Sequence, residues 1–126
     1  FKNSGTGIIN GAGVIIYLSG TGAEMELKNT VNLSAPTSGT YSGVLVFQDR
    51  SSTKDIELKD EALSGTFSGA LYAYAGDIEI DLNTPGTIQN TQLVANKVKL
   101  EGSSLTIQGA NVSGGGGGGK SAALIE

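Results

Sequence analysis

Residues 114–121 form the most recognisable chemical motif of the chain, because they read Gly-Gly-Gly-Gly-Gly-Gly-Lys-Ser. This matches the phosphate-binding loop G-x-x-x-x-G-K-[ST], in which backbone amides and a lysine hold nucleotide phosphates at the start of a helix. Only residues 122–126 follow, too few for that helix and for a further strand. Since a glycine tract satisfies any glycine pattern, we interpret residues 114–120 as a Gly-rich linker rather than a nucleotide site.

Acidic side chains alternate along one short segment, where Asp77, Glu79 and Asp81 share one face of an expected strand. Carboxylate oxygens in this arrangement could bind a hard cation such as Ca²⁺. Stacking of similar strands would place Asp55 and Glu57 in the neighbouring coil, about 5 Å away. The pattern therefore favours a solvated, negatively charged outer face, and calcium binding remains the alternative.

Two lysines repeat the same alternation in the next such segment, at positions 97 and 99. We expect Lys97 and Lys99 to lie opposite Glu79 and Asp81 in the adjacent coil, where they would neutralise part of the acidic charge. Exposed ion pairs of this kind contribute only about 0–1 kcal/mol each. The lysines are therefore expected to balance the charge of the face rather than to hold the fold together.

Catalytic chemistry is restricted by the composition, because the chain has no His and no Cys. Ser–His and Cys–His nucleophile pairs, thiolate or imidazole zinc sites and disulfides are thereby excluded. Paired carboxylates could still hydrolyse a glycosidic bond, with Asp55, Glu57, Asp77 and Glu79 as candidates. The chain has a single Arg and no Trp for sugar stacking. We expect no enzyme, no cofactor and no resident metal, and a fragment of a carbohydrate-active enzyme remains an alternative.

Three short motifs receive structural interpretations. The pair Asp49-Arg50 predicts an ion pair in a turn. Asn32-Leu33-Ser34 and Asn111-Val112-Ser113 match the glycosylation sequon, but we interpret both asparagines as turn or Asn-ladder positions, with modification as the alternative.

Two aromatic residues occupy equivalent places in a sequence repeat, since residues 38–43 read Ser-Gly-Thr-Tyr-Ser-Gly and residues 64–69 read Ser-Gly-Thr-Phe-Ser-Gly. We expect Tyr41 and Phe67 to stack one above the other in the core, which adds about 0.5–1.5 kcal/mol beyond burial. A surface adhesion patch is the alternative, because the chain has three further tyrosines. These are Tyr17, Tyr72 and Tyr74.

The elements that must position these residues are short strands, because apolar residues alternate with period 2 and no segment keeps a helical period for two turns. Gly contributes 20 of the 126 residues, which suits a chain that turns often. An apolar strand, an alternating strand, a short strand and a Gly-rich turn follow one another four times. The apolar strands begin at residues 14, 44, 70 and 92.

A repeat of about 20–30 residues with three short strands predicts one coil of a parallel β-helix per repeat. We expect a short right-handed parallel β-helix (β-solenoid) of about four coils over residues 1–113, a linker over 114–120 and a C-terminal strand over 121–126. The alternative is an antiparallel β-sandwich or jelly roll. It is disfavoured because Asn10-Gly11 is the only two-residue hairpin signal of the Asn-Gly or Asp-Gly type.

The net charge of −4 argues against nucleic acid or an anionic lipid surface as a partner. The longest apolar stretch, residues 14–18, is far shorter than the roughly 20 residues that span a bilayer. No signal peptide is recognisable, and Phe at position 1 predicts processing or a fragment. We therefore expect no membrane contact for this segment.

The run Phe47-Gln48-Asp49-Arg50, within residues 39–50, resembles segments of bacterial proteins associated with tight-adherence (Flp-type) pilus assembly. Over roughly residues 13–110 the sequence resembles the C-terminal β-helical region of these TadE/TadG-like surface proteins. The resemblance implies an exported extracellular module on the bacterial cell surface with a structural or adhesive role.

The expected function follows from the open ends of so short a stack, because unpaired strand edges invite pairing with another chain. We predict a structural subunit of a bacterial surface filament or pilus-like assembly, present as a homo-oligomer or homopolymer. Two alternatives remain: an adhesin module that binds a glycan, a host surface or other surface proteins, and the carbohydrate-active fragment named above.

Overall fold

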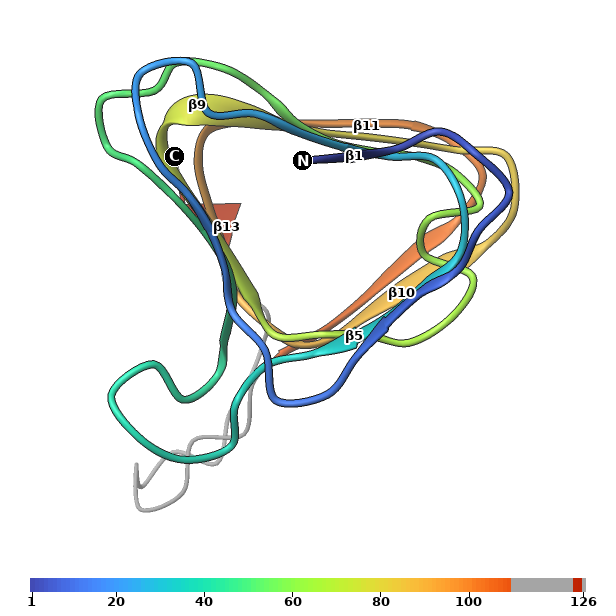
Figure 1. The fold of residues 1–126 in the computed structure, drawn as a ribbon. Coiled ribbons are helices and arrows are strands. Elements are labelled where there is room, and N and C mark those ends of the chain that lie inside the picture. Colours follow the sequence, from blue (N-terminus) through green and yellow to red (C-terminus); the bar gives the residue numbers. More distant parts are fainter. Residues whose placement is uncertain (110–123, 126) are drawn as a thin grey trace.

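The computed structural model describes residues 1–109, 124 and 125, and shows an all-β chain wound into a β-solenoid of about five turns. Seen along its axis, the solenoid has a roughly triangular outline, and strands of successive coils stack along its three sides (Figure 1). The described strand pairs are all parallel. The predicted parallel β-helix is therefore confirmed, and the antiparallel sandwich is excluded.

The three sides of the triangle are called here the charged face, the Asn face and the apolar face. The charged face consists of β1 (Lys2–Asn3), β4 (Met25–Leu27), β7 (Ile56–Asp60) and the second halves of β9 (Ala70–Leu82) and β11 (Leu93–Gly102). The Asn face consists of β2 (Ile9–Gly11), β5 (Val31–Ser34), β8 (Phe67–Ser68), β10 (Gly86–Thr91) and β12 (Leu105–Gly109). The apolar face consists of β3 (Ile16–Leu18), β6 (Val44–Gln48), the first halves of β9 and β11, and β13 (Leu124–Ile125).

The number of coils is about five rather than the predicted four. The additional coil begins with β1, where Lys2 pairs with Glu26 of the next coil. Its first two strands have two and three residues, too short for an alternation to be recognised. Counting from the first apolar strand therefore missed them.

The core lies inside the triangle, because period-2 alternation sends every second side chain of each strand inward. One inner column on the charged face joins Leu27, Leu58 and Ile80, all fully buried, in successive coils. On the apolar face Leu71 lies between Val46 and Leu93 and is equally buried. The interior is thus a stack of mostly aliphatic side chains, without ionised groups among the described residues.

The predicted stack of Tyr41 on Phe67 is wrong. Phe67 is fully buried and pairs with Leu33, whereas Tyr41 is 59% exposed. The reason is an insertion: residues 36–43 leave the second coil as a loop, which Gly43 closes by donating its N–H to the Pro36 carbonyl at 2.7 Å. The loop is the teal excursion at the lower left of Figure 1. The third coil has no such insertion, so the two sequence repeats are out of register, and only the strands that follow them align, with Val44 opposite Ala70.

The Asn-ladder interpretation of Asn32 is supported by its contacts on the Asn face. Its amide Nδ2 donates to Oδ1 of Asn10 at 2.9 Å, and its own Oδ1 accepts the Thr66 N–H at 3.0 Å. The side chain therefore links three consecutive coils. Asn111, the linker at 114–120 and most of the predicted strand at 121–126 lie outside the described residues, although β13 pairs in parallel with β11.

The predicted ion pair within Asp49-Arg50 is replaced by two other interactions. The Asp49 carboxylate accepts hydrogen bonds from the Ser51 hydroxyl, the Ser51 N–H and the Gly20 N–H, which lower its pKa. Arg50 instead places its guanidinium 4.2 Å from the ring centre of Tyr74. A short acidic side chain at a turn binds backbone N–H groups more readily than its sequence neighbour.

Candidate functional site

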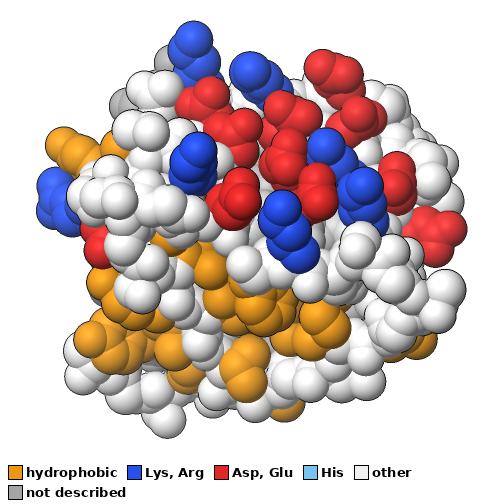
Figure 2. All heavy atoms as spheres, turned by 45° about the horizontal axis from the view of Figure 1, so that its top comes forward, with side chains coloured by type: hydrophobic (Ala, Val, Ile, Leu, Met, Phe, Trp, Pro, Cys, Tyr) orange, Lys and Arg blue, Asp and Glu red, His pale blue; other side chains and the backbone are white. Residues whose placement is uncertain are grey.

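The charged face gathers acidic and basic side chains on one side of the solenoid, as Figure 2 shows. Strand pairing places five of them in one outward column across the coils. In chain order these are Lys2, Glu26, Glu57, Glu79 and Lys99. Neighbouring members are separated by about 4.8 Å of strand spacing, so three glutamates stand together with a lysine at each end of the column.

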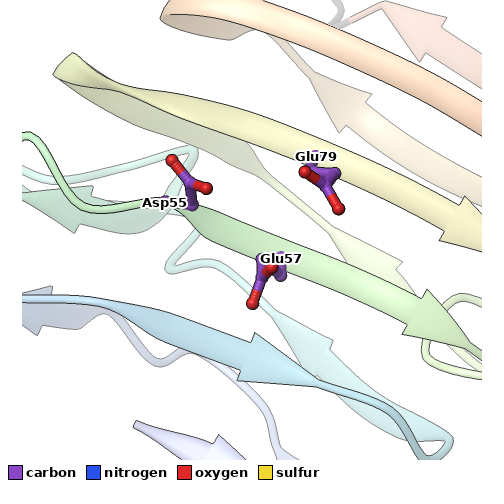
Figure 3. A group of neighbouring side chains, drawn as sticks. All are labelled: Asp55, Glu57 and Glu79. Carbon is purple, nitrogen blue, oxygen red and sulfur yellow. The ribbon is translucent and has the colours of Figure 1, made fainter.

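Three carboxylates converge at the middle of this face, where oxygens of Asp55, Glu57 and Glu79 lie within 4.8 Å of one another. Figure 3 shows Asp55 and Glu57 on or beside β7 and Glu79 on the adjacent β9. The expected proximity of neighbouring coils is thus confirmed. The predicted row is divided, however, since Asp77 instead accepts a hydrogen bond from Asn96 at 2.9 Å.

The positive charge that balances this cluster comes from Lys59, which sequence reasoning missed. Its Nζ lies 3.3 Å from Glu57 and 3.7 Å from Glu26. Lys59 follows Glu57 by two residues, so strand alternation puts both side chains on the outer face, and this was the available signal.

The predicted partners of the two later lysines are shifted by two residues. Lys97 lies opposite Asp77, and Lys99 lies opposite Glu79. The coil length at this point places Asp81 opposite Glu101 instead. Like charges therefore meet there, which weakens strand pairing slightly.

The electrostatics of the cluster combine partial burial with charges of both signs around Glu57. Partial burial raises the pKa of Glu57 above its ordinary value, Lys59 opposes this shift, and Glu26 adds to it. The ion pair with Glu57 in turn raises the pKa of Lys59. Ca²⁺ takes six to eight oxygen ligands, and here an ammonium already occupies one side of Glu57. The geometry therefore fits a charge-balanced outer face.

Replacing Glu57 by Gln is expected to stabilise the protein at pH 7 by less than about 1 kcal/mol, because it removes a partly buried carboxylate that also lies beside Glu26, while Lys59 keeps Glu26 as its partner. The pKa of Glu57 is higher in the folded than in the unfolded protein. Its contribution to the free energy of unfolding is therefore fully present below the unfolded pKa of about 4.5 and is lost as the pH rises through the folded pKa. The advantage of E57Q should therefore vanish in acid. Urea unfolding at pH 7 and below pH 4 measures it, with the exposed Glu61→Gln as control; equal stability of both proteins at pH 7 contradicts the expectation.

The apolar face carries the second notable surface, an aromatic ladder on its outer side. Tyr17 and Phe47 lie with ring centres 5.8 Å apart, and Phe47 stacks on Tyr72 at 4.9 Å with nearly parallel rings. Val94 continues the column in the next coil. Strand alternation normally puts polar residues on the outer side of a strand. Here the outer column is aromatic, so both the inner and the outer side of this face are apolar. The sequence signal was a recurring aromatic residue in the apolar strands.

Beside this ladder lies a hollow of about 490 Å³, lined by Ile15, Tyr17, Tyr41 and Phe47. Tyr41 is therefore part of an aromatic surface rather than of an interior stack. Tyr17 and Tyr72 of the ladder belong to the same surface. Tyr74, the remaining tyrosine of the predicted patch, is exposed under Arg50 and does not line the hollow.

These features define a parallel β-solenoid protein with one charged face and one apolar face. No protein family model, curated protein or solved structure matches the chain. Among the described residues, no helix has the length and apolar character needed to cross a membrane.

Proposed function

We propose that the chain is a non-catalytic structural module of an extracellular bacterial surface filament or pilus-like assembly. It associates with further copies of itself through an exposed strand edge, and has no nucleic acid or membrane partner in this segment. The sequence resemblance to TadE/TadG-like proteins supports the location on the bacterial surface. The parallel β-solenoid fold supports association through a strand edge.

The observation that carries this proposal is the exposure of one core column at its last member. Leu27, Leu58 and Ile80 are 0–1% exposed, whereas Leu100, which continues the same column, is 56% exposed. A further coil stacked on β11 would bury Leu100 as its neighbours are buried. Such a coil is supplied by a second copy in the proposed assembly.

The backbone of the coil that contains β11 also supports association through this edge. The second half of β11 pairs with β9 on one side and has no described strand partner on the other. Unpaired strand edges bind other strands, and lysines at such an edge limit indiscriminate pairing. Lys97 and Lys99 stand on this coil, so we propose a selective association that strengthens with salt as the lysines are screened.

Replacing Leu100 by Asp is expected to abolish assembly while leaving the single protein folded. The side chain is already exposed in the isolated chain, so the change in unfolding free energy should be within about 0.5 kcal/mol. In the assembly, the same carboxylate would be buried without a partner. Electron microscopy and analytical ultracentrifugation at micromolar concentration measure the effect.

Tyr74→Asp is the matched control, since it places the same charge at an exposed position on β9 rather than on the unpaired second half of β11. It should assemble like the wild type. Discrete wild-type monomers in the micrograph, or filaments of L100D indistinguishable from wild type, would each contradict the proposed function.

A further inference from the structure

The hollow on the apolar face is walled mainly by aromatic rings. Its walls are the rings of Tyr17, Tyr41 and Phe47 with the side chain of Ile15. Tyr17 and Tyr41 are 58% and 59% exposed, so neither ring contributes much to the core. A volume of about 490 Å³ falls within the range of pockets that bind small organic ligands.

The position of Tyr41 is fixed by the loop that carries it. The Ser42 N–H donates to the Gly39 carbonyl at 3.2 Å, and the Val44 N–H donates to the Tyr41 carbonyl at 3.1 Å. Gly39 and Gly43 adopt positive φ angles of 89° and 84°, which glycine reaches without strain. With the Gly43 closure, these bonds fix the backbone that carries the exposed Tyr41 ring before any ligand arrives, which reduces the entropy lost on binding.

The other wall is held by the aromatic ladder. Phe47 is stacked on Tyr72 with an interplanar angle of 5°, whereas Tyr17 is tilted by 42° against Phe47. The parallel stack covers one face of Phe47, while the tilt leaves the Tyr17 ring turned out of the stack. The hollow is thus bounded by two rings of the ladder, Tyr17 and Phe47, and by the Tyr41 ring of the inserted loop.

The chemistry of the lining restricts the ligand. The residues that line the hollow carry no charge, although the chain has a net charge of −4 and concentrates its ionised groups on a different face. The lining therefore favours a neutral ligand. Aromatic rings attract the slightly positive C–H groups of an apolar ligand face through their negative π-clouds. The two tyrosine hydroxyls can donate and accept hydrogen bonds at the rim. A pyranose ring combines an apolar C–H face with a rim of hydroxyls.

We propose that this hollow binds a neutral sugar unit of a glycan, placed between Tyr17 and Tyr41. The site is independent of the strand edge at Leu100, and binding therefore does not require assembly. Without charged contacts, a single sugar unit should bind with a Kd of about 1 mM, and several copies in an assembly would raise the effective affinity.

The test uses the folded L100D protein and titrates it with maltose, cellobiose, chitobiose and lactose, followed by NMR chemical shifts. At least one sugar should saturate near 1 mM, with shifts concentrated at Tyr17, Tyr41 and Phe47. Tyr41→Ala should weaken that binding at least tenfold. Tyr41→Phe should lose less, because the ring remains. Tyr74→Ala, an exposed tyrosine outside the hollow, should bind like the parent.

Three results would overturn this site. They are the absence of saturable binding for all four sugars up to about 20 mM, unchanged binding by Tyr41→Ala, and binding of a proline-rich peptide in place of any sugar at the same residues. Because L100D is the parent protein, failure of sugar binding leaves the proposed assembly unaffected, and failure of assembly leaves the sugar site standing.

Discussion

Replacing Leu71 by Asp is expected to unfold the protein. Leu71 is fully buried on the apolar face, with Val46 and Leu93 as its neighbours in the adjacent coils. An unpaired carboxylate at this position would lose its hydration and gain no partner, a penalty of several kcal/mol even after protonation. Domains of this size are stable by only about 5–15 kcal/mol, and loss of a buried leucine side chain by itself typically costs about 2–5 kcal/mol. Circular dichroism and urea unfolding at pH 7 measure the loss.

Tyr74→Asp tests whether the effect arises from burial or from the aspartate itself. Tyr74 belongs to the same strand but is exposed, so its replacement should change stability by no more than about 1 kcal/mol, mainly through the lost contact with Arg50. A soluble L71D protein with wild-type unfolding would mean that position 71 does not face the interior, and the stacked arrangement of coils would be wrong.

The fold could be predicted from the sequence because its interior imposes a period. Alternation in segments such as 77–82 requires one buried and one solvated side, and repetition of three strand types at similar spacing favours stacked parallel coils over hairpins. The first coil escaped this reasoning, because its β1 and β2 span only two and three residues. Their place in the fold depends on backbone pairing with β4 and β5, and segments of two or three residues are too short to show an alternation of apolar and polar side chains.

The registers between coils could not be predicted to the residue, since each depends on the lengths of the intervening corners. Stacking of the acidic segments in neighbouring coils was expected, but not which members would meet: the actual cluster combines Asp55 and Glu57 with Glu79 alone. A shift of two residues also changed the partners of Lys97 and Lys99. Side-chain clusters in a solenoid are therefore set by corner length as much as by the strands themselves.

Replacing Phe67 by Ala is expected to destabilise the protein by about 3–5 kcal/mol. Phe67 is among the largest fully buried side chains, and it lies on the Asn face in β8, a strand of only two residues. The cavity would lie between coils whose backbones are already paired to β5 and β10, so the walls can close only partly. Urea unfolding with an unchanged m-value would show that the native state, rather than the unfolded chain, has been affected.

Tyr41→Ala is the decisive companion to F67A, because the two aromatic residues are equivalent in the sequence repeat but not in the structure. Removing the exposed Tyr41 ring should change stability by less than about 0.5 kcal/mol, since residues 36–43 are held by backbone hydrogen bonds. Equal losses of stability for the two variants would indicate that Tyr41 is buried in a stack with Phe67, and would contradict the placement of residues 36–43 in an exposed loop. A large loss for F67A alone means that one repeated motif serves two purposes: its phenylalanine fills the core of the third coil, and its tyrosine faces solvent beside the aromatic ladder.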